Sequence, residues 1–538
     1  MGFNTRRTNR LLSPWTWFLA AITLGIAWRL IDAFLNFPIW GDEAAILLNL
    51  LERHYLDLLK PLNYQQVAPI LYLVLEKGFL ANVGYSNFIL RLPAFLAGFA
   101  AIPMVYLAAR QFGGRYTAFL ATSLALLSLT LVRYTNMVKP YSIDLFLSAT
   151  ILYLGMRLLK KPKSFSRAIL FLPLVPVSIL LSYPSVFMIA AVGLVSGIQV
   201  LRRGSFLSRL AILATTCAAV STFLPMYLHI GQGQLDTTRA MMEHYWRREF
   251  PPLDWGFPLW LLKAHTSAMF SYPAGGRYGL ALLIFPLSVV GAVSIWRRKS
   301  PAYALMLILP FLFTMAAAFP HRYPYGGEAR VEQHLAVCIF ILAATGTLVL
   351  GKLLLAKLKQ PRRMLRLVVI STIGFYLACA TVSLIADIRK PYISTAYHDL
   401  DTLERRIFTP DLGMQDRVIV MQKFEGDPLF TIRYGYQMQP HLPAPRGIVT
   451  IYHQMLESAD LPLPLVPGQI AWLVAVHGED DPYWPAWLSR AGITYRQLDP
   501  PQMFKVEAGP ENLRFPWVDV LHIQVESIAK PTASQPAP

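Results

Sequence analysis

Long apolar stretches recur along this chain and are separated by short polar connections. Most of them hold roughly 18 residues or more, the length that crosses the core of a bilayer as a helix. The stretches that we expect to span a membrane are residues 14–36, 91–110, 116–133, 141–158, 168–183, 184–201, 209–230, 278–296, 301–319, 332–351 and 365–387. The pattern therefore predicts a polytopic α-helical membrane protein with about eleven transmembrane helices.

Lysine and arginine gather at every second connection. Short cytoplasmic loops are enriched in both residues, so we expect these connections and the N-terminus to lie in the cytoplasm. The basic positions are Arg6, Arg7 and Arg10; Arg110 and Arg115; Lys160, Lys161, Lys163 and Arg167; Arg202, Arg203 and Arg209; Arg297, Arg298 and Lys299; and Lys357, Lys359, Arg362 and Arg363. The first apolar run is too long for a removable signal peptide, and we expect it to be an uncleaved first span.

Two further apolar stretches, residues 67–83 and 259–270, would invert this charge pattern if they crossed the membrane. Both fall in outside loops, and we expect them to form helices that lie in the outer membrane interface. The second follows a segment rich in aromatic residues, which suit the headgroup level of a bilayer. These residues are Tyr245, Trp246, Trp255 and Trp260.

The composition changes after about residue 388. Short β-like runs follow at residues 417–421, 469–476, 494–498 and 518–525, with a helical stretch at 482–491 that ends at Gly492. We therefore divide the chain into a transmembrane domain, residues 1–388, and a small extracytoplasmic α/β domain, residues 389–530. The expected outer loops of the first are residues 37–90, 231–277 and 320–331. The tail, residues 531–538, is expected to be disordered.

The charge of the chain changes this picture little. The formal net charge is +18, but only 15% of the residues are charged, against about a quarter in soluble proteins. Because the cations lie between apolar stretches, we interpret them as topology signals and expect no nucleic-acid partner. The three cysteines lie inside apolar segments without metal or disulfide spacing. No metal site and no cofactor are assigned, although a divalent metal stays open.

Two adjacent carboxylates, Asp42 and Glu43, follow Trp40-Gly41 in the first outside loop. An acidic pair before AAILLNLL suits the start of a helix, with Asp42 as N-cap and Glu43 favourable to the helix dipole. Alternatively, a carboxylate where a span meets outer water could act as a general base on an acceptor hydroxyl. Adjacent helical positions point about 100° apart, so one carboxylate rather than a cooperating pair would do this.

Cations with aromatic neighbours occur at two more outer positions. In KPYSID, Lys139 suits a phosphate at headgroup height and Tyr141 adds a hydroxyl donor, while an interfacial anchor is the alternative. The segment HRYPYGGEARVEQH holds Arg322 and Arg330, whose guanidinium groups bind phosphate oxygens in pairs. Its tyrosines, Tyr323 and Tyr325, are candidate substrate contacts. Glu328 and Glu332 could instead neutralise the arginines.

Two polar residues on the first span complete the set. Arg29 and Asp32 are three positions apart, on one face of a helix, and we expect a buried structural ion pair. Glycine loops of the Walker or Rossmann type are absent from the sequence, which argues against a user of ATP or of nucleotide sugars.

Three segments in a fixed order carry a resemblance to a known family. They are the Asp-Glu loop after the first span, the Gln66–Pro69 segment, and RLPAFLAGFAAIPMVYLAARQFGG over Arg91–Gly114. The chain thus resembles bacterial polytopic glycosyltransferases of the GT-C fold, which include protein O-mannosyltransferases and the aminoarabinose and galacturonic acid transferases of lipid A. It departs from them in having Pro69 alone where two prolines are common, and in lacking an evident acidic residue there.

The resemblance implies a sugar donor linked to polyprenyl phosphate and transfer at the outer face of the membrane. Asp42 looks like the family's catalytic carboxylate, with Glu43 beside it. Lys139, Tyr141, Arg322 and Arg330 would meet the donor phosphate, and Gln66, Tyr323 and Tyr325 are further candidate substrate contacts. The expected partners are membrane lipids and a glycan, lipid or protein acceptor. Topology and resemblance together predict a bacterial inner membrane, with the C-terminal domain in the periplasm.

Two other functions use the same residues. A transporter or flippase of lipid-linked glycans would need the outer cations for binding alone, and its expected signs are two related halves and polar residues at mid-membrane. A scaffold without catalytic activity would leave the acidic loop unexplained. The large outside loops and the outside α/β domain favour the transferase, with inverting displacement and Asp42 as base.

Overall fold

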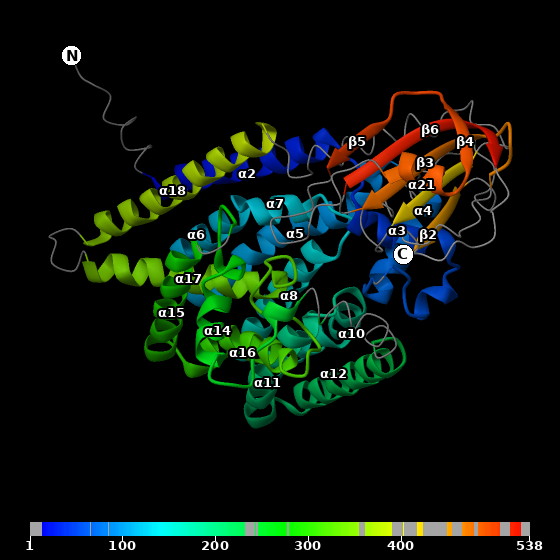
Figure 1. Cartoon of the computed structure of the whole chain (residues 1–538). Coiled ribbons are helices and arrows are strands. Elements are labelled where there is room, and N and C mark those ends of the chain that lie inside the picture. Colours follow the sequence, from blue (N-terminus) through cyan, green and yellow to red (C-terminus); the bar gives the residue numbers. More distant parts are fainter. Residues whose placement is uncertain are drawn as a thin grey trace, which may run out of the picture. The chain divides into compact units, whose positions relative to one another are not determined.

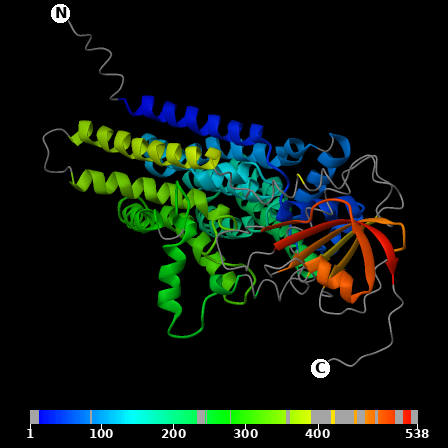
Figure 2. The same cartoon turned by 45° about the horizontal axis from the view of Figure 1, so that its top comes forward.

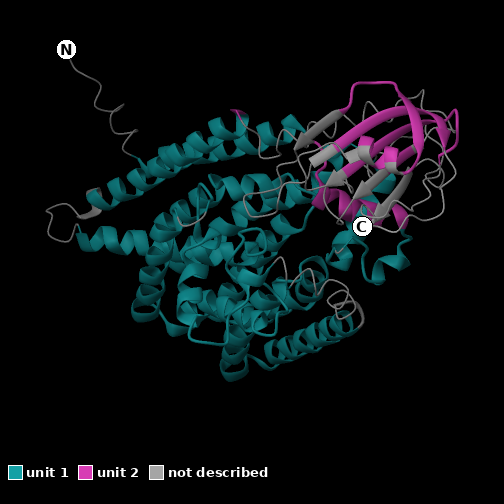
Figure 3. Ribbon diagram, viewed as in Figure 1, with its two compact units in different colours: residues 1–36, 53–388 teal, residues 37–52, 389–538 magenta. Residues whose placement is uncertain are grey.

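The chain forms two compact units in the computed structural model, residues 1–36 with 53–388 and residues 37–52 with 389–538 (Figure 3). The structure describes residues 13–64, 66–83, 86–231, 243, 246–276, 279–354, 361–389, 402, 417–422, 449–453, 465–477, 483–505 and 517–528. The predicted tail at 531–538 and Tyr245 lie outside these residues. The two units are described separately below.

The first unit is a bundle of helices (Figure 1). In chain order its longer helices are α2 (Pro14–Leu35), α4 (Ile70–Asn82), α5 (Asn87–Gly113), α6 (Arg115–Leu126), α7 (Leu129–Thr135), α8 (Tyr141–Lys160), α10 (Phe171–Leu181), α11 (Ser185–Arg203), α12 (Phe206–Pro225), α14 (Phe257–His265), α15 (Ala281–Arg298), α16 (Pro301–Ala318), α17 (Gln333–Leu354) and α18 (Pro361–Arg389). Shorter pieces are η1 (Leu56–Leu59), α9 (Phe165–Ala168), η2 (Met226–Gly231), η3 (Arg247–Glu249) and η4 (Ala268–Phe270).

Among the described residues, nine helices are long and apolar enough to cross a membrane, and ten if the bent pair α6 and α7 counts as one span. The remaining predicted span, residues 168–183, corresponds to the shorter apolar helix Phe165–Leu181. Every predicted span therefore has a helical counterpart, and the chain is a multi-pass membrane protein. Helices α4 and α14, in the stretches expected to lie in the interface, have 13 and 9 residues. Both are too short to cross a bilayer.

The predicted span at 116–133 is not one straight helix, because it bends by 61° between α6 and α7. The Ser128 hydroxyl accepts a hydrogen bond from the Leu131 N–H and so caps a new helix. The Leu129 N–H, which could not find an intrahelical partner at a helix start, donates to the Pro273 carbonyl at 2.8 Å. The bend is therefore built from a cap and a long-range contact that apolar periodicity does not reveal.

Arg29 and Asp32 are both buried, as expected, but they form hydrogen bonds to other groups instead of a direct ion pair with each other. The Arg29 guanidinium donates to the Leu126, Ala125 and Gly25 carbonyls, the shortest contact being 2.7 Å. Asp32 instead accepts a 2.6 Å hydrogen bond from the Asn136 amide. The bend after α6 exposes carbonyls at the end of that helix, and these compete successfully for the arginine.

Helices α2 and α18 lie side by side in both views of the bundle (Figures 1 and 2). A Cβ placed on Gly374 of α18 would lie 3.2 Å from the Trp17 ring of α2. Near the end of α18, Asp387 forms a 2.9 Å ion pair with Arg133 of α7. Two polar contacts thus join these helices: Asn136, just after α7, binds Asp32 of α2, and Arg133 of α7 binds Asp387 of α18.

Helices α15 and α17 approach each other through two glycines. A Cβ on Gly346 would lie 1.8 Å from the Leu287 carbonyl oxygen, and one on Gly291 would lie 2.0 Å from the Leu342 carbonyl oxygen. Small residues at such crossings allow helix backbones to pack closely where no hydrophobic driving force between helices exists. Neither glycine can be enlarged without separating the two helices.

The second unit contains α3 (Gly41–Glu52) and a six-stranded sheet. The strands are β1 (Arg417–Gln422), β2 (Val449–His453), β3 (Ile470–His477), β4 (Ile493–Gln497), β5 (Gln502–Lys505) and β6 (Trp517–Ile528). Their order is β2-β1-β3-β6-β4, with β5 paired to β6. The β1, β2 and β3 strands are parallel, whereas β6 runs antiparallel to β3, β4 and β5.

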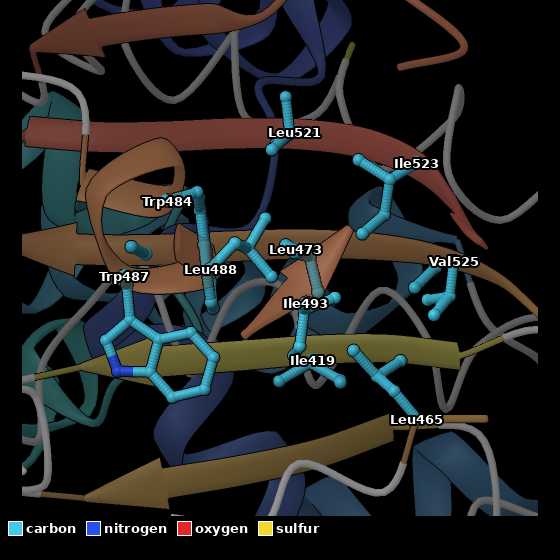
Figure 4. Packing of buried hydrophobic residues seen from close by; sticks show 12 residues of the cluster. Ile419, Leu465, Leu473, Trp484, Trp487, Leu488, Ile493, Leu521, Ile523 and Val525 are labelled. Carbon is cyan, nitrogen blue, oxygen red and sulfur yellow. The ribbon is translucent and has the colours of Figure 1, made fainter. Parts of the chain in front are cut away.

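The core of this unit lies between the sheet and α21 (Tyr483–Arg490) (Figure 4). Trp484 and Trp487 of the helix are buried against strand residues that include Leu473 and Leu521. The Trp484 N–H donates to an Asp519 carboxylate oxygen at 3.2 Å, which ties the helix start to β6. Four strands and this helix match the runs expected from the sequence, while β2 and β5 were not expected.

Replacing Gly346 by alanine should destabilise the bundle by about 1–3 kcal/mol, because the new methyl group would meet the Leu287 backbone. Gly193 of α11 is the matched control, since a Cβ there would meet nothing within 4 Å. Gly193→Ala should leave the melting temperature unchanged or raise it, because alanine is the better helix former. Thermal unfolding of the purified proteins in detergent measures both. Equal melting temperatures for the two variants would contradict the close crossing.

Candidate active site

The acidic pair lies in the first turn of α3. The Trp40 carbonyl accepts hydrogen bonds from the Glu43 and Ala44 N–H groups at 2.9 Å, so Trp40 acts as the N-cap. The Glu43 carboxylate reaches back to the Trp40 N–H at 3.4 Å, which is half of a capping box. Glu43 is buried, whereas Asp42 is half-buried. The local geometry therefore gives Glu43 a capping contact and leaves Asp42 the more accessible carboxylate.

Lys139 and Gln66 are brought together from segments 73 residues apart. The Lys139 ammonium donates to the Gln66 side-chain carbonyl at 2.8 Å, and Lys139 is only 5% exposed. A buried ammonium needs polar partners to offset lost hydration. This contact with a neutral amide helps to position the ammonium.

The segment that carries Gln66 is itself held in place. The Tyr183 hydroxyl, from the connection between α10 and α11, donates to the Ala68 carbonyl at 3.0 Å. Burial raises the pKa of Tyr183, so its hydroxyl keeps the proton that this bond requires. Pro69 follows in extended conformation and caps α4. The role of Tyr183 as a support for the Gln66 segment was not evident from the sequence.

Tyr141 and Tyr323 come from different elements and lie near one another. Tyr141 begins α8, and its ring centroid lies 5.1 Å from that of Tyr134. The Tyr323 hydroxyl donates to the Val331 carbonyl at 2.6 Å. Burial raises the pKa of Tyr323 well above its usual value, and Glu332, Asp144 and Tyr141 raise it further through their charge. The predicted tyrosines of two segments thus share one polar region with Asp144.

The two predicted arginines differ in their surroundings. Arg330 lies 3.3 Å from the Glu328 carboxylate, and its guanidinium lies 5.3 Å from the centre of the Trp246 ring. Arg322 is exposed, and its side chain forms no hydrogen bond or ion pair within the described part of the chain. Glu328 therefore partly neutralises Arg330, which is one of the alternatives considered from the sequence. Arg322 is the more available cation.

Glu332 supports the loop instead of neutralising an arginine. Its carboxylate accepts a 2.8 Å hydrogen bond from the Gly326 N–H. Burial raises the pKa of Glu332 to about 8, although this hydrogen bond opposes the shift. Gly326 has a φ of 88°, and a Cβ there would lie 2.5 Å from the Ala264 Cβ, so only glycine fits. The glycine pair expected to form a turn is thus fixed to a buried carboxyl.

Tyr325 is buried beside this turn. Its N–H donates to the Glu249 carbonyl at 3.0 Å, and its hydroxyl lies 3.0 Å from the His265 Nε2. His265 Nδ1 lies 2.8 Å from the Leu261 carbonyl, so Nδ1 carries the proton and Nε2 accepts from Tyr325. Burial lowers the pKa of His265, consistent with a neutral ring. The tyrosine, predicted as a substrate contact, thus anchors the loop to α14.

The structure does not add a metal ligand set. Among the residues that it describes, no group of three or more His, Cys, Asp or Glu side chains could hold a metal ion. The contacts of Tyr183, Glu249 and Glu332 were missed from the sequence. The Tyr183 and Glu249 contacts pair groups far apart in the chain, where no spacing rule connects them.

Sequence comparisons assign no relative, since no protein-family model and no curated protein sequence matches the chain. Similar proteins are found among the solved structures. ArnT from Cupriavidus metallidurans bound to undecaprenyl phosphate has a TM-score of 0.52 and 13% identity, with 94% of this chain and 98% of that chain covered. The same protein in the apo state has a TM-score of 0.49 and 15% identity, with 93% and 97% covered.

An oligosaccharyltransferase from Archaeoglobus fulgidus in the apo form is more distant, with a TM-score of 0.43 and 12% identity. It covers 80% of this chain, and 64% of its own length is matched. The fold argument rests on the first ArnT structure, which matches the chain over both the helical and the C-terminal parts. The chain therefore shares the fold of ArnT, the GT-C fold expected from the sequence.

Proposed function

We propose that this protein is a membrane glycosyltransferase that moves a sugar from a polyprenyl-phosphate donor to an acceptor hydroxyl at the outer face of the membrane. The observation that carries the proposal is the buried Lys139 ammonium held by Gln66 beside the start of α8. It stands in a fold shared with ArnT, whose structure contains undecaprenyl phosphate. The membrane is the bacterial inner membrane, with the C-terminal unit in the periplasm and a glycan, lipid or protein as acceptor.

Asp42 is the general base. Its carboxylate is half-buried in the first turn of α3, where the helix N-terminus favours a negative charge. It removes the acceptor proton as the acceptor oxygen bonds to the anomeric carbon. The bond from that carbon to the phosphate oxygen breaks at the same time, and the electron pair leaves with the phosphate. The displacement therefore inverts the anomeric centre, and Glu43 supports it by fixing the start of the helix.

Cations stabilise the departing polyprenyl phosphate. Lys139 is the central one, because it is buried and Gln66 helps to set its position. Tyr141 adds a hydroxyl, and Arg322 supplies a second, exposed cation. Arg330 contributes less, since Glu328 already shares its charge. Fixed cations aimed at a charge that grows in the transition state accelerate the reaction more than they tighten the ground state.

Replacing Asp42 by asparagine should lower turnover by about 10²- to 10⁴-fold, the usual contribution of a positioned general base. The assay follows release of polyprenyl phosphate from a panel of polyprenyl-phosphate sugars by purified protein in liposomes. Glu43→Gln is the neighbouring control and should mainly lower the melting temperature, because it weakens the capping contact. Turnover of Asp42→Asn close to wild type, at normal protein levels, would remove Asp42 as the base. Donor binding without turnover by the wild type would favour a transporter.

Lys139→Gln should weaken donor-dependent kcat/KM by roughly 10- to 100-fold, because it deletes the charge but keeps a polar side chain beside Gln66. Gln66→Leu should give a smaller loss, since the cation stays but loses its positioning contact. Donor titrations at saturating acceptor measure both. If Lys139→Gln changed only the acceptor KM, the cation would not be a donor-phosphate contact.

The two arginines should respond differently to alanine. Arg322→Ala should lower donor-dependent kcat/KM by about tenfold with an unchanged melting temperature, because the side chain is exposed. Arg330→Ala should lower the melting temperature as well, since Glu328 loses its ion-pair partner and Trp246 loses the guanidinium stacked on its ring. Unchanged donor kinetics in both variants would remove the loop from phosphate binding.

A further inference from the structure

A second cationic region lies at the opposite end of α8 from Lys139. There a cavity of about 510 Å³ is lined by Lys160, Lys161, Pro162, Lys163, Ser164 and Arg203. These residues belong to the C-terminal ends of α8 and α11 and to the turn after α8. The 20 residues of α8 separate this cavity from Lys139 by about 30 Å. It is therefore independent of the proposed donor site.

Among the described residues, no acidic side chain forms an ion pair with the cations around this cavity. Lys160 donates to the Gln111 side chain at 2.8 Å, so a neutral amide orients it. In the part of the chain that the structure describes, the side chains of Lys161, Lys163 and Arg203 form no hydrogen bond or ion pair. The sequence contains no Asp or Glu between Asp144 and Asp236. Four like charges gathered at one cavity repel each other, and a bound anion would relieve that repulsion.

The backbone that shapes the cavity is tied at two points. The Ser205 hydroxyl donates to the Lys163 carbonyl at 3.1 Å and accepts from the Ser208 N–H at 3.2 Å, so the cap of α12 also holds the turn. Arg167 donates to the Arg157 carbonyl at 2.6 Å and ties α9 to α8. These hydrogen bonds fix the backbone of the turn after α8 and of the connection between α11 and α12, which carry the cations of the cavity.

Exposed apolar side chains flank the cations in the sequence. Phe165 follows Ser164 and is 42% exposed, while Leu201 and Phe206 flank Arg203 and are 57% and 79% exposed. A soluble phosphate would need the cations alone. Cations next to exposed apolar groups suit an amphiphile with a phosphate head and acyl chains, and basic pockets at transmembrane helix ends recognise such lipids.

We propose that this cavity binds the phosphate headgroup of an anionic phospholipid from the leaflet opposite the donor site. Lys161, Lys163 and Arg203 contact the headgroup phosphate, and Lys160, fixed by Gln111, forms the inner side of the site. Phe165, Leu201 and Phe206 lie beside the acyl chains. The site needs no sugar donor and no catalytic turnover.

The test compares three full-length proteins purified in detergent. Besides the wild type, one carries Lys161→Gln, Lys163→Gln and Arg203→Gln. The matched control carries Arg115→Gln, Arg298→Gln and Lys352→Gln, which remove three exposed cations from other helix ends that do not line the cavity. Native mass spectrometry measures binding of phosphatidylglycerol, of phosphatidylcholine with the same acyl chains, and of inorganic phosphate.

The wild type should bind phosphatidylglycerol more tightly than phosphatidylcholine. The cavity variant should lose roughly 100-fold of that affinity, because each cation near an anionic lipid contributes on the order of 1 kcal/mol. Lys163→Gln alone should lose part of it, and the control should keep it. Equal losses in both triple variants, or no preference for phosphatidylglycerol, would overturn the site. Inorganic phosphate that binds as tightly, with the same dependence on the cavity residues, would overturn the lipid as its ligand.

Discussion

Charged side chains buried among apolar helices need polar partners, and this requirement shapes the helical unit. Removing a charge from water costs several kcal/mol, which hydrogen bonds must offset. Arg29 meets the requirement with carbonyls at the end of α6, Asp32 with Asn136, and Lys139 with Gln66. Each contact joins segments that are distant in the chain. The polar groups therefore specify which helices and loops meet, while apolar packing supplies most of the stabilising free energy.

The contrast between the two ends of the helices has a functional meaning. At the end that carries Lys139, two polar groups are buried and have identified partners, Gln66 on the ammonium and Glu332 on the Gly326 turn. Such groups are preorganised for a charge that develops at a fixed place. At the other end, Lys161, Lys163 and Arg203 line an open cavity, and none of its lining residues is acidic. Those cations suit a ligand that carries its negative charge before it binds.

The proposed chemistry also divides between the two compact units. Asp42 belongs to α3, which groups with the C-terminal sheet, whereas Lys139, Tyr141 and Arg322 belong to the helical unit.

The sequence alone determined the broad architecture and the candidate residues. Apolar blocks of membrane-spanning length, basic connections and short β-like runs each depend on residues close together in the chain, so their periodicity predicted every helical span and four of the six strands. Only the tertiary structure decided how the polar residues are used. It bent the span at Ser128, gave Arg29 and Asp32 different hydrogen-bond partners, and placed Gln66 on Lys139. These pairings depend on which distant groups remain unsatisfied once the helices pack, and no local pattern records that competition.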